Sequence, residues 1–350
     1  MQEPEVAISD ARDRGDRLRV GEVGIVQREA EVAPVAGEDE GGFCQVSSQQ
    51  VLLPEPLQFI ECRFSEGAAM HCPACSSRAT SERSARTQLG YRRFRCRDCG
   101  RGFNERSGTM FNRLQYPTDI VCLVVLWRLR YKLSLRDLVE MFALRGFVFT
   151  HEAVREWEEK LAPHVSKELR KARRGKVGRS WYTDETYLRV AGRWCYLYRA
   201  IDRAGNLVDV RLSETRDRAA AEAFFASAQA VTGITPHRVT TDGHDAYPGA
   251  IKAKLGKKVT HRTSRYLNNH LEQDHRGIKG RYRPMRGFKS VASAHRFCRA
   301  YDEVRHFLRF PSPRNRRLSL DEQRWFHLRQ VNRLLAIMEQ AARSYRASGG

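Results

Sequence analysis

The chain contains no apolar stretch long enough to cross a lipid bilayer. Its longest apolar run, Ile120–Trp127, has eight residues, whereas a membrane-spanning helix needs about 20. The first residues do not have the pattern of a signal peptide, and the sequence shows no internal repeat. These absences exclude a protein with helical membrane spans, and we expect no membrane partner.

Acidic side chains are outnumbered by basic ones. The chain has 41 Asp and Glu residues and 62 Lys and Arg residues, for a formal net charge of +21. The first 69 residues hold 14 acidic and six basic side chains, a net charge of −8, which leaves +29 for the remaining 281 residues. A field of this sign favours a polyanionic partner over small neutral ligands. Nucleic acid is therefore the first candidate partner.

Cysteine is scarce, with nine residues in 350. Four form two close pairs, and the others are scattered without ligand-like spacing. This usage is typical of a reduced intracellular protein with one metal site, so we expect a cytoplasmic protein that acts at the nucleoid. The scattered cysteines are interpreted as packing residues: Cys44, Cys62, Cys122, Cys195 and Cys298.

Composition and periodicity divide the chain into five segments. The first shows no sustained period, which is typical of disorder, and Met70 directly precedes the first cysteine pair, so one hypothesis places the true translation start near Met70. Later the pattern changes to helical spacing and then to strands and helices in the order βββαβαβα. The predicted segments are an acidic, disordered N-terminal segment (1–69), a zinc ribbon (70–105), a helical helix-turn-helix domain (115–175), an α/β catalytic domain (178–310) and a basic helical tail (311–350).

Two pairs of cysteines have the spacing of a metal site. Cys72 and Cys75 are separated by two residues, and after 20 further residues Cys96 and Cys99 repeat this spacing. Four thiolates in two knuckles fit a structural, tetrahedral Zn²⁺ ion, and four unrelated cysteines rarely fall in this pattern. We predict a zinc ribbon whose cationic second half can contact phosphates through Arg92, Arg93, Arg95 and Arg97.

A pair of helices with a short connection is predicted between residues 134 and 157. Ser134 and Thr150 are placed as the N-caps of the two helices. This is the pattern of a helix-turn-helix, whose second helix enters the DNA major groove. Any helical hairpin gives a similar pattern, and the second helix is rich in glutamate, which opposes phosphate binding. If the motif binds DNA, the residues nearest the bases are His151, Glu152 and Arg155, above a packed layer of Leu138, Val154 and Trp157.

Three acidic residues occupy special positions in the α/β segment. Asp184 lies in the middle of a β-run, where a carboxylate is costly unless it is paired or bound to a metal. Asp242 directly follows a second strand, and Glu272 lies on a helix that presents His275 and Lys279 on the same face. Two strands and a helix thus offer the oxygen ligands that two Mg²⁺ or Mn²⁺ ions need for phosphodiester chemistry.

Taken alone, each of these acids could equally form a surface ion pair. Their neighbours Glu185, Asp245 and Asp274 are alternative candidates for the metal-binding acids. The surrounding charge favours a nucleic-acid site, because 12 Lys or Arg residues and only two acids lie between Lys252 and Lys289. Such a cluster is self-repelling without an anionic partner. We predict that DNA lies along this face, with contacts from His275, Arg276, Arg281, Arg283 and Lys289, in addition to Arg155.

Three stretches together give the sequence a family resemblance: Trp181–Tyr187 with Trp194–Asp202, then Thr241–Pro248, then Tyr266–Lys279. From about residue 177 to residue 310, the chain resembles the DDE transposases of bacterial insertion sequences, most closely the IS-six type. The resemblance implies a ribonuclease-H-like α/β fold, a mixed five-stranded sheet flanked by helices. It places Asp184, Asp242 and Glu272 on the acidic triad of the family and Lys279 on the basic residue seven positions later.

The resemblance also implies a reaction. Metal-activated water frees a 3′-hydroxyl at the end of the element, and this hydroxyl attacks target DNA without a covalent enzyme intermediate, to give a product like a replicative cointegrate. The partners would be the terminal inverted repeats and target DNA, and holding two ends together predicts a homodimer or a larger assembly. The acidic start and the four-cysteine ribbon depart from many relatives.

Two other functions stay open on the residues alone. A DNA-binding regulator with an inactive transposase fold would bind DNA without strand transfer. A structure-selective nuclease would only hydrolyse, using water where a transposase uses a 3′-hydroxyl end.

Overall fold

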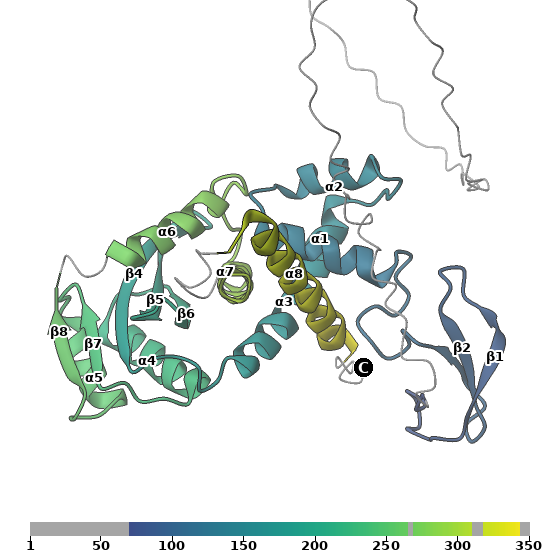
Figure 1. Ribbon diagram of the computed structural model, residues 1–350, viewed down its shortest axis with the longest axis horizontal. Helices are drawn as coiled ribbons and strands as arrows, with labels where there is room; N and C mark the ends of the chain where they lie inside the picture. The colour runs from purple at the N-terminus through teal and green to yellow at the C-terminus, as the bar shows by residue number, and fades with distance from the viewer. Residues whose placement is uncertain (1–69, 265–268, 310–317, 344–350) are drawn as a thin grey trace, which may run out of the picture. The chain divides into compact units, whose positions relative to one another are not determined.

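A computed structural model describes residues 70–264, 269–309 and 318–343 of the chain (Figure 1). The segment predicted to be disordered (1–69), with Cys44 and Cys62, lies outside these residues, as do Tyr266 and the start of the predicted basic tail. Within the described ranges, no helix is long and apolar enough to cross a membrane.

The first element is a small antiparallel sheet of three strands, β1 (Thr80–Arg86), β2 (Arg92–Cys96) and β3 (Gly102–Asn104). Its core is little more than Phe94 stacked on Phe103, with ring centroids 5.4 Å apart, and two buried cysteine side chains. So few apolar side chains cannot offset the entropy of ordering the chain. Modules of this size are usually stabilised by a bound metal ion.

Three helices follow: α1 (Thr118–Arg130), α2 (Leu135–Ala143) and α3 (His151–Ala172). Both predicted N-caps are confirmed, since the Ser134 hydroxyl accepts a hydrogen bond from the Asp137 amide and the Thr150 hydroxyl accepts one from Ala153. The predicted packing layer is confirmed as well, because Leu138, Val154 and Trp157 are all buried.

The second sheet has five strands and is surrounded by helices in the predicted order. Strands β6, β5 and β4 pair antiparallel, whereas β4, β7 and β8 pair parallel. The sheet order is β6-β5-β4-β7-β8 (Figure 1), the mixed sheet of a ribonuclease-H-like core. The elements are β4 (Ser180–Val190), β5 (Arg193–Asp202), β6 (Leu207–Ser213), α4 (Arg218–Thr232), β7 (Arg238–Thr241), α5 (Ala246–Lys254), β8 (Thr260–Thr263) and α6 (Asn269–Tyr282).

The two faces of this sheet have different partners because side chains alternate along a strand. On one face, Trp181 packs with residues of α4 and α5. On the other face, Leu188 and Val190 join a core that includes α7 (Val291–Phe307). Asp184 has the same parity as Leu188 and Val190, so it lies on the face that α6 and α7 cover.

The last helix, α8 (Leu320–Arg343), packs against α1 and α3 (Figure 1). Its residues Leu334 and Met338 are fully buried in the same core as α7, and the Met110 amide donates a hydrogen bond to the Ala342 carbonyl at 3.4 Å. Among the scattered cysteines, those within the described residues are buried, as predicted: Cys122, Cys195 and Cys298.

Buried ion pairs join the end of α3 to the sheet and to α7. Arg173 and Glu303 form two hydrogen bonds of 2.7 Å, and Arg170 contacts Asp209 on β6 at 2.8 Å. Both carboxylates are fully buried. Removing one partner of such a pair leaves an uncompensated buried charge, so these contacts hold α3, α7 and the sheet in one arrangement.

Candidate active site and metal-binding residues

Asp184 and Asp242 lie side by side because their strands are parallel neighbours. Tyr182 on β4 is in register with Thr240 on β7, and each aspartate stands two residues further along its own chain. The Asp184 side chain is 19% exposed and the Asp242 side chain is 36% exposed. The carboxylates thus lie next to each other where β7 ends beside the middle of β4, and both are accessible from solvent.

The electrostatics of this pair fit a cation. Burial, followed by the charges of Glu185 and Asp242, raises the pKa of Asp184 to about 7. The contacts of Asp184 Oδ2 and Asp242 Oδ2 are long, since His275 Nδ1 lies 4.0 Å from the former and Arg216 Nη2 lies 3.6 Å from the latter. Two partly buried carboxylates with weak partners are suited to ligate a hard divalent metal ion.

Glu185 and Asp245, two of the alternative acids, have other roles. The Glu185 carboxylate is buried on the opposite face of β4, where it accepts short hydrogen bonds from the Arg216 guanidinium and the Tyr247 hydroxyl. Asp245 is exposed and directly precedes α5. These contacts leave Asp184 and Asp242 as the acids available for a shared ligand.

Asp274, the third alternative, fastens α6 to its neighbours. Its Oδ2 lies 3.3 Å from the Arg199 guanidinium on β5, and its Oδ1 lies 2.8 Å from that of Arg305 on α7. Arg305 also donates to the Asp274 carbonyl at 3.3 Å and packs so closely on Gly277 that an added Cβ would meet its guanidinium at 2.8 Å. An arginine and a glycine of two different helices therefore fix the position of α6.

The structure does not bring Glu272 into a common cluster with the two aspartates. Glu272 is exposed on the first turn of α6. Among the described residues, the four cysteines of the ribbon are the one group of three or more His, Cys, Asp or Glu side chains whose ligand atoms lie within 4.8 Å of one another. The role of Glu272 as a third ligand therefore stays a prediction.

His275 occupies a different place from the one predicted. It was expected to contact DNA from the surface, but it is only 7% exposed and lies beside Asp184. Burial, then the charges of Arg199 and Lys279, lowers its pKa to about 4, so the ring is neutral. Its Nε2 atom is buried without a hydrogen-bond partner in the described part of the chain. His275 thus belongs to the wall of the carboxylate site.

Arg281 does not fit the prediction of a DNA contact either. Its side chain is only 2% exposed, donates to the Arg128 carbonyl and lies over the Phe297 ring, 5.7 Å from the centroid. A guanidinium enclosed in this way cannot reach a phosphate. The remaining predicted DNA contacts are exposed: Arg155 on α3, Arg276 on α6, and Arg283 and Lys289 in the segment that follows. Lys279, the predicted basic residue of the catalytic site, is also exposed on α6.

The four paired cysteines converge in the ribbon. Cys72 Sγ lies 3.6 Å from Cys99 Sγ, and Cys75 Sγ lies 3.6 Å from Cys96 Sγ. The Cys75 amide donates to the Cys72 sulfur and lowers the pKa of that thiol to about 7, and the Cys99 amide lowers the pKa of Cys96. Backbone donors that stabilise thiolates are what a metal knuckle needs.

One of the predicted cationic residues of the ribbon is already engaged. Arg92 pairs with the buried carboxylate of Glu105 and is 12% exposed. Arg93, Arg95 and Arg97 are exposed. They form the outward-facing basic surface of the ribbon, which is smaller than predicted.

Sequence reasoning missed two arginines of the site. Arg199 stands opposite Asp184 in the β4–β5 register and is buried between Asp274 and Asp302. Arg216 contacts both Glu185 and Asp242. An arginine inside an apolar strand, as in Leu197–Ile201, is itself a signal of a buried ion pair.

Comparisons with known proteins match the part of the chain that holds the two aspartates. A family model of a DDE domain matches residues 178–310. The transposase for insertion sequence-like element IS431mec of Staphylococcus aureus is 39% identical over 175 residues, which cover 49% of this chain and 77% of that protein. The transposase for insertion sequence element IS257 in transposon Tn4003, also from Staphylococcus aureus, is similar to the same extent.

A solved structure, the cryoEM structure of the simian T-cell lymphotropic virus intasome in complex with PP2A regulatory subunit B56 gamma, shares 16% sequence identity with a TM-score of 0.30. The match covers 39% of this chain and 51%, or about half, of that chain. At this score the superposition adds nothing to the assignment.

Proposed function

Because the chain belongs to the DDE transposases of bacterial insertion sequences, of the IS-six type, we propose that it binds the terminal inverted repeats of its element, cleaves there and joins the 3′-hydroxyl ends to target DNA. The observation that carries this proposal is the pairing of Asp184 with Asp242 on adjacent parallel strands. The raised pKa of Asp184 supports it, because a nearby cation would offset the repulsion between the two carboxylates.

The residues have distinct roles in this proposal. Asp184 and Asp242 hold two Mg²⁺ or Mn²⁺ ions, and Glu272 on α6 completes the ligand set. When bound, the ions supply Lewis-acid activation of the attacking oxygen and of the scissile phosphodiester. Lys279, exposed near the end of α6, binds a phosphate of the strand being cut. The neutral ring of His275 forms part of the wall beside Asp184.

DNA is held over a wider surface. Arg276, Arg283 and Lys289 lie exposed beside or beyond the catalytic helix and would neutralise backbone phosphates. The four ribbon cysteines would hold one structural Zn²⁺ ion. The ribbon and Arg155 on α3 would recognise the ends of the element. Simultaneous capture of two ends requires a homodimer or a larger assembly on DNA, acting in the cytoplasm at the nucleoid.

The test is an in vitro reaction with labelled terminal-repeat DNA, a target plasmid and Mg²⁺ or Mn²⁺. Glu272→Gln should bind DNA as the wild type does and yield no cut or joined product. Asp245→Asn is the matched control, because it removes an exposed carboxylate close to Asp242 in sequence, and it should react normally. DNA binding without products in the wild type would favour the regulator, and nicking without joining would favour the nuclease.

A further inference from the structure

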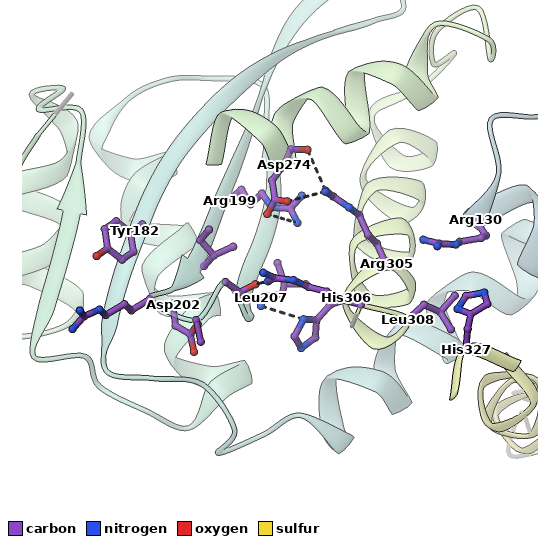
Figure 2. A pocket seen from close by; sticks show the side chains of 15 residues that line it. Arg130, Tyr182, Arg199, Asp202, Leu207, Asp274, Arg305, His306, Leu308 and His327 are labelled. Atoms are coloured by element: carbon purple, nitrogen blue, oxygen red, sulfur yellow. Dashed lines mark hydrogen bonds and ion pairs between the residues drawn. The ribbon is translucent and has the colours of Figure 1, made fainter. Parts of the chain in front are cut away.

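A cavity of about 840 Å³ is lined by residues of the sheet, α6 and α7, together with Arg130 at the end of α1 and His327 of α8 (Figure 2). Its walls are rich in arginine. Arg199 comes from β5, Arg203 from the β5–β6 turn, Arg305 and Arg309 from α7 and the residues after it, and Arg130 from the end of α1.

The cavity carries an excess of positive charge. Five arginines and two aspartates line it, and Asp302 behind the wall pairs with Arg199, which leaves a net charge of +2. Asp202 is committed to the β5–β6 turn, where it accepts hydrogen bonds of 2.7 to 2.9 Å from Gly178 and Asn206. Asp274 is committed to Arg199 and Arg305 (Figure 2). Neither acid is free to neutralise the remaining arginines.

Two of these arginines are available to a ligand. Neither the Arg130 guanidinium nor the Arg203 guanidinium has a hydrogen-bond or ion-pair partner within the residues that the structure describes. The two histidines of the cavity do not compensate, because burial and neighbouring arginines lower the pKa of His306 to about 4 and also lower that of His327. A cationic cavity of this kind attracts anions.

The cavity adjoins the catalytic pair directly. Tyr182 in its wall stands two residues before Asp184 on the same face of β4, and Arg199 is the register partner of Asp184 on β5. Asp274 stands two residues after Glu272 on α6. A DNA strand with its scissile phosphate at Asp184 would therefore have its next phosphates within reach of this space.

We propose that this cavity receives backbone phosphates of the DNA strand next to the scissile position, with Arg130 and Arg203 as the contacting residues. This inference rests on the proposed function and assigns a strand-holding site to it. The adjoining chain segment 310–317 is an unsuitable occupant, since it contains Arg314, Arg316 and Arg317 and no acidic residue. Phosphates are also carried by free polyphosphates, which the experiment must separate from DNA.

The experiment compares Arg130→Glu and Arg203→Glu with Arg193→Glu. Arg193 is exposed, like Arg203. It is the first residue of β5, whereas Arg203 directly follows the last residue of that strand. Arg193→Glu therefore makes the same charge change away from the cavity. Each cavity variant should weaken binding to terminal-repeat DNA about tenfold at 0.1 M salt and reduce the slope of log K against log salt by about one. The control should do neither.

Phosphate-ethylation interference locates the contact. Ethylation next to the scissile position should block binding by the wild type and by Arg193→Glu, and it should no longer do so for Arg203→Glu. Unchanged interference in both cavity variants would overturn the proposal. A second result would also overturn it: pyrophosphate raises the Tm of the wild type but not that of Arg203→Glu, while the two proteins bind DNA with equal affinity. The cavity would then hold a free polyphosphate.

These results are separable from the proposed function. The comparison of wild type with Glu272→Gln reports on cutting and joining, whereas the cavity variants are scored by DNA affinity and by the position of the phosphate contact. A wild-type protein that joins DNA while both cavity variants bind like the control would refute the strand-holding site alone.

Discussion

The ribbon and the carboxylate site gather their ligands in opposite ways. In the ribbon, a turn that precedes β1 and the turn between β2 and β3 bring four sulfur atoms within 4.8 Å of one another. In the catalytic domain, the acids come from β4, from the end of β7 and from α6, and only the two on the sheet lie together. Local spacing is enough to build the first site, whereas the second depends on where a separate helix is placed.

The largest effect should come from removing a carboxylate that the sheet positions. Asp184→Asn should reduce strand cleavage by on the order of 10⁴-fold, as expected for a residue that acts as part of one catalytic unit. The same variant should be at least as stable as the wild type in metal-free buffer, because a partly buried charge that is repelled by the nearby carboxylates of Glu185 and Asp242 is lost. Cleavage assays and thermal unfolding measure the two effects.

The contrast with the ribbon supplies a control for this variant. Asp184→Asn should retain one Zn²⁺ per chain by metal analysis, since the cysteines are elsewhere in the fold. A variant that lost both zinc and activity would show that the two sites are coupled, against the independence that we infer.

A smaller effect should follow from loosening the helix instead of removing a ligand. Asp274→Asn weakens the contacts with Arg199 and Arg305, so α6 is held less firmly and activity should fall about 10- to 100-fold. Raising the concentration of Mn²⁺ should recover part of that loss if misplaced ligands are the cause. The measurement is the metal dependence of cleavage at saturating DNA.

Asp209→Asn is the matched variant for Asp274→Asn. It also removes the charge of an aspartate paired with arginine, but on β6, and its side chain is fully buried. It should lower the free energy of unfolding by about 3 kcal/mol without changing the metal dependence of the folded enzyme. If the metal dependence of cleavage were the same in Asp274→Asn and Asp209→Asn, Asp274 would have a structural role only.

The smallest effect on the chemistry should come from the ribbon. Cys96→Ser should release the zinc and unfold residues around β1–β3, because their apolar core is too small to persist without metal. Binding of terminal-repeat DNA should weaken about tenfold, while cleavage at saturating DNA should stay close to that of the wild type. A loss of cleavage at saturation would place the ribbon in the catalytic step.

Much of this arrangement could be predicted from sequence because it is encoded locally. The paired cysteines, the caps at Ser134 and Thr150 and the order of strands and helices each follow from short-range spacing. The adjacency of Asp184 and Asp242 depends in addition on the pairing of their two strands, and β4 and β7 are parallel neighbours in the sheet.

What escaped prediction depends on packing between distant segments. Arg281 belongs to a run of basic residues in the sequence, and nothing local distinguishes it from its exposed neighbour Arg283. Its burial follows from the approach of α7, which carries Phe297, and of α1, which ends near Arg128. The burial of His275 escaped prediction for the same reason. The sequence shows which residues share a face of α6, but not which element packs against that face.

The return of α8 to α1 and α3 has a consequence for how the protein is made. On a ribosome, the early helices emerge long before the segment that buries Leu334 and Met338 against them, so their apolar surface stays uncovered while the catalytic domain is being synthesised. Packing of the helical layer is therefore completed only after the catalytic domain has been synthesised.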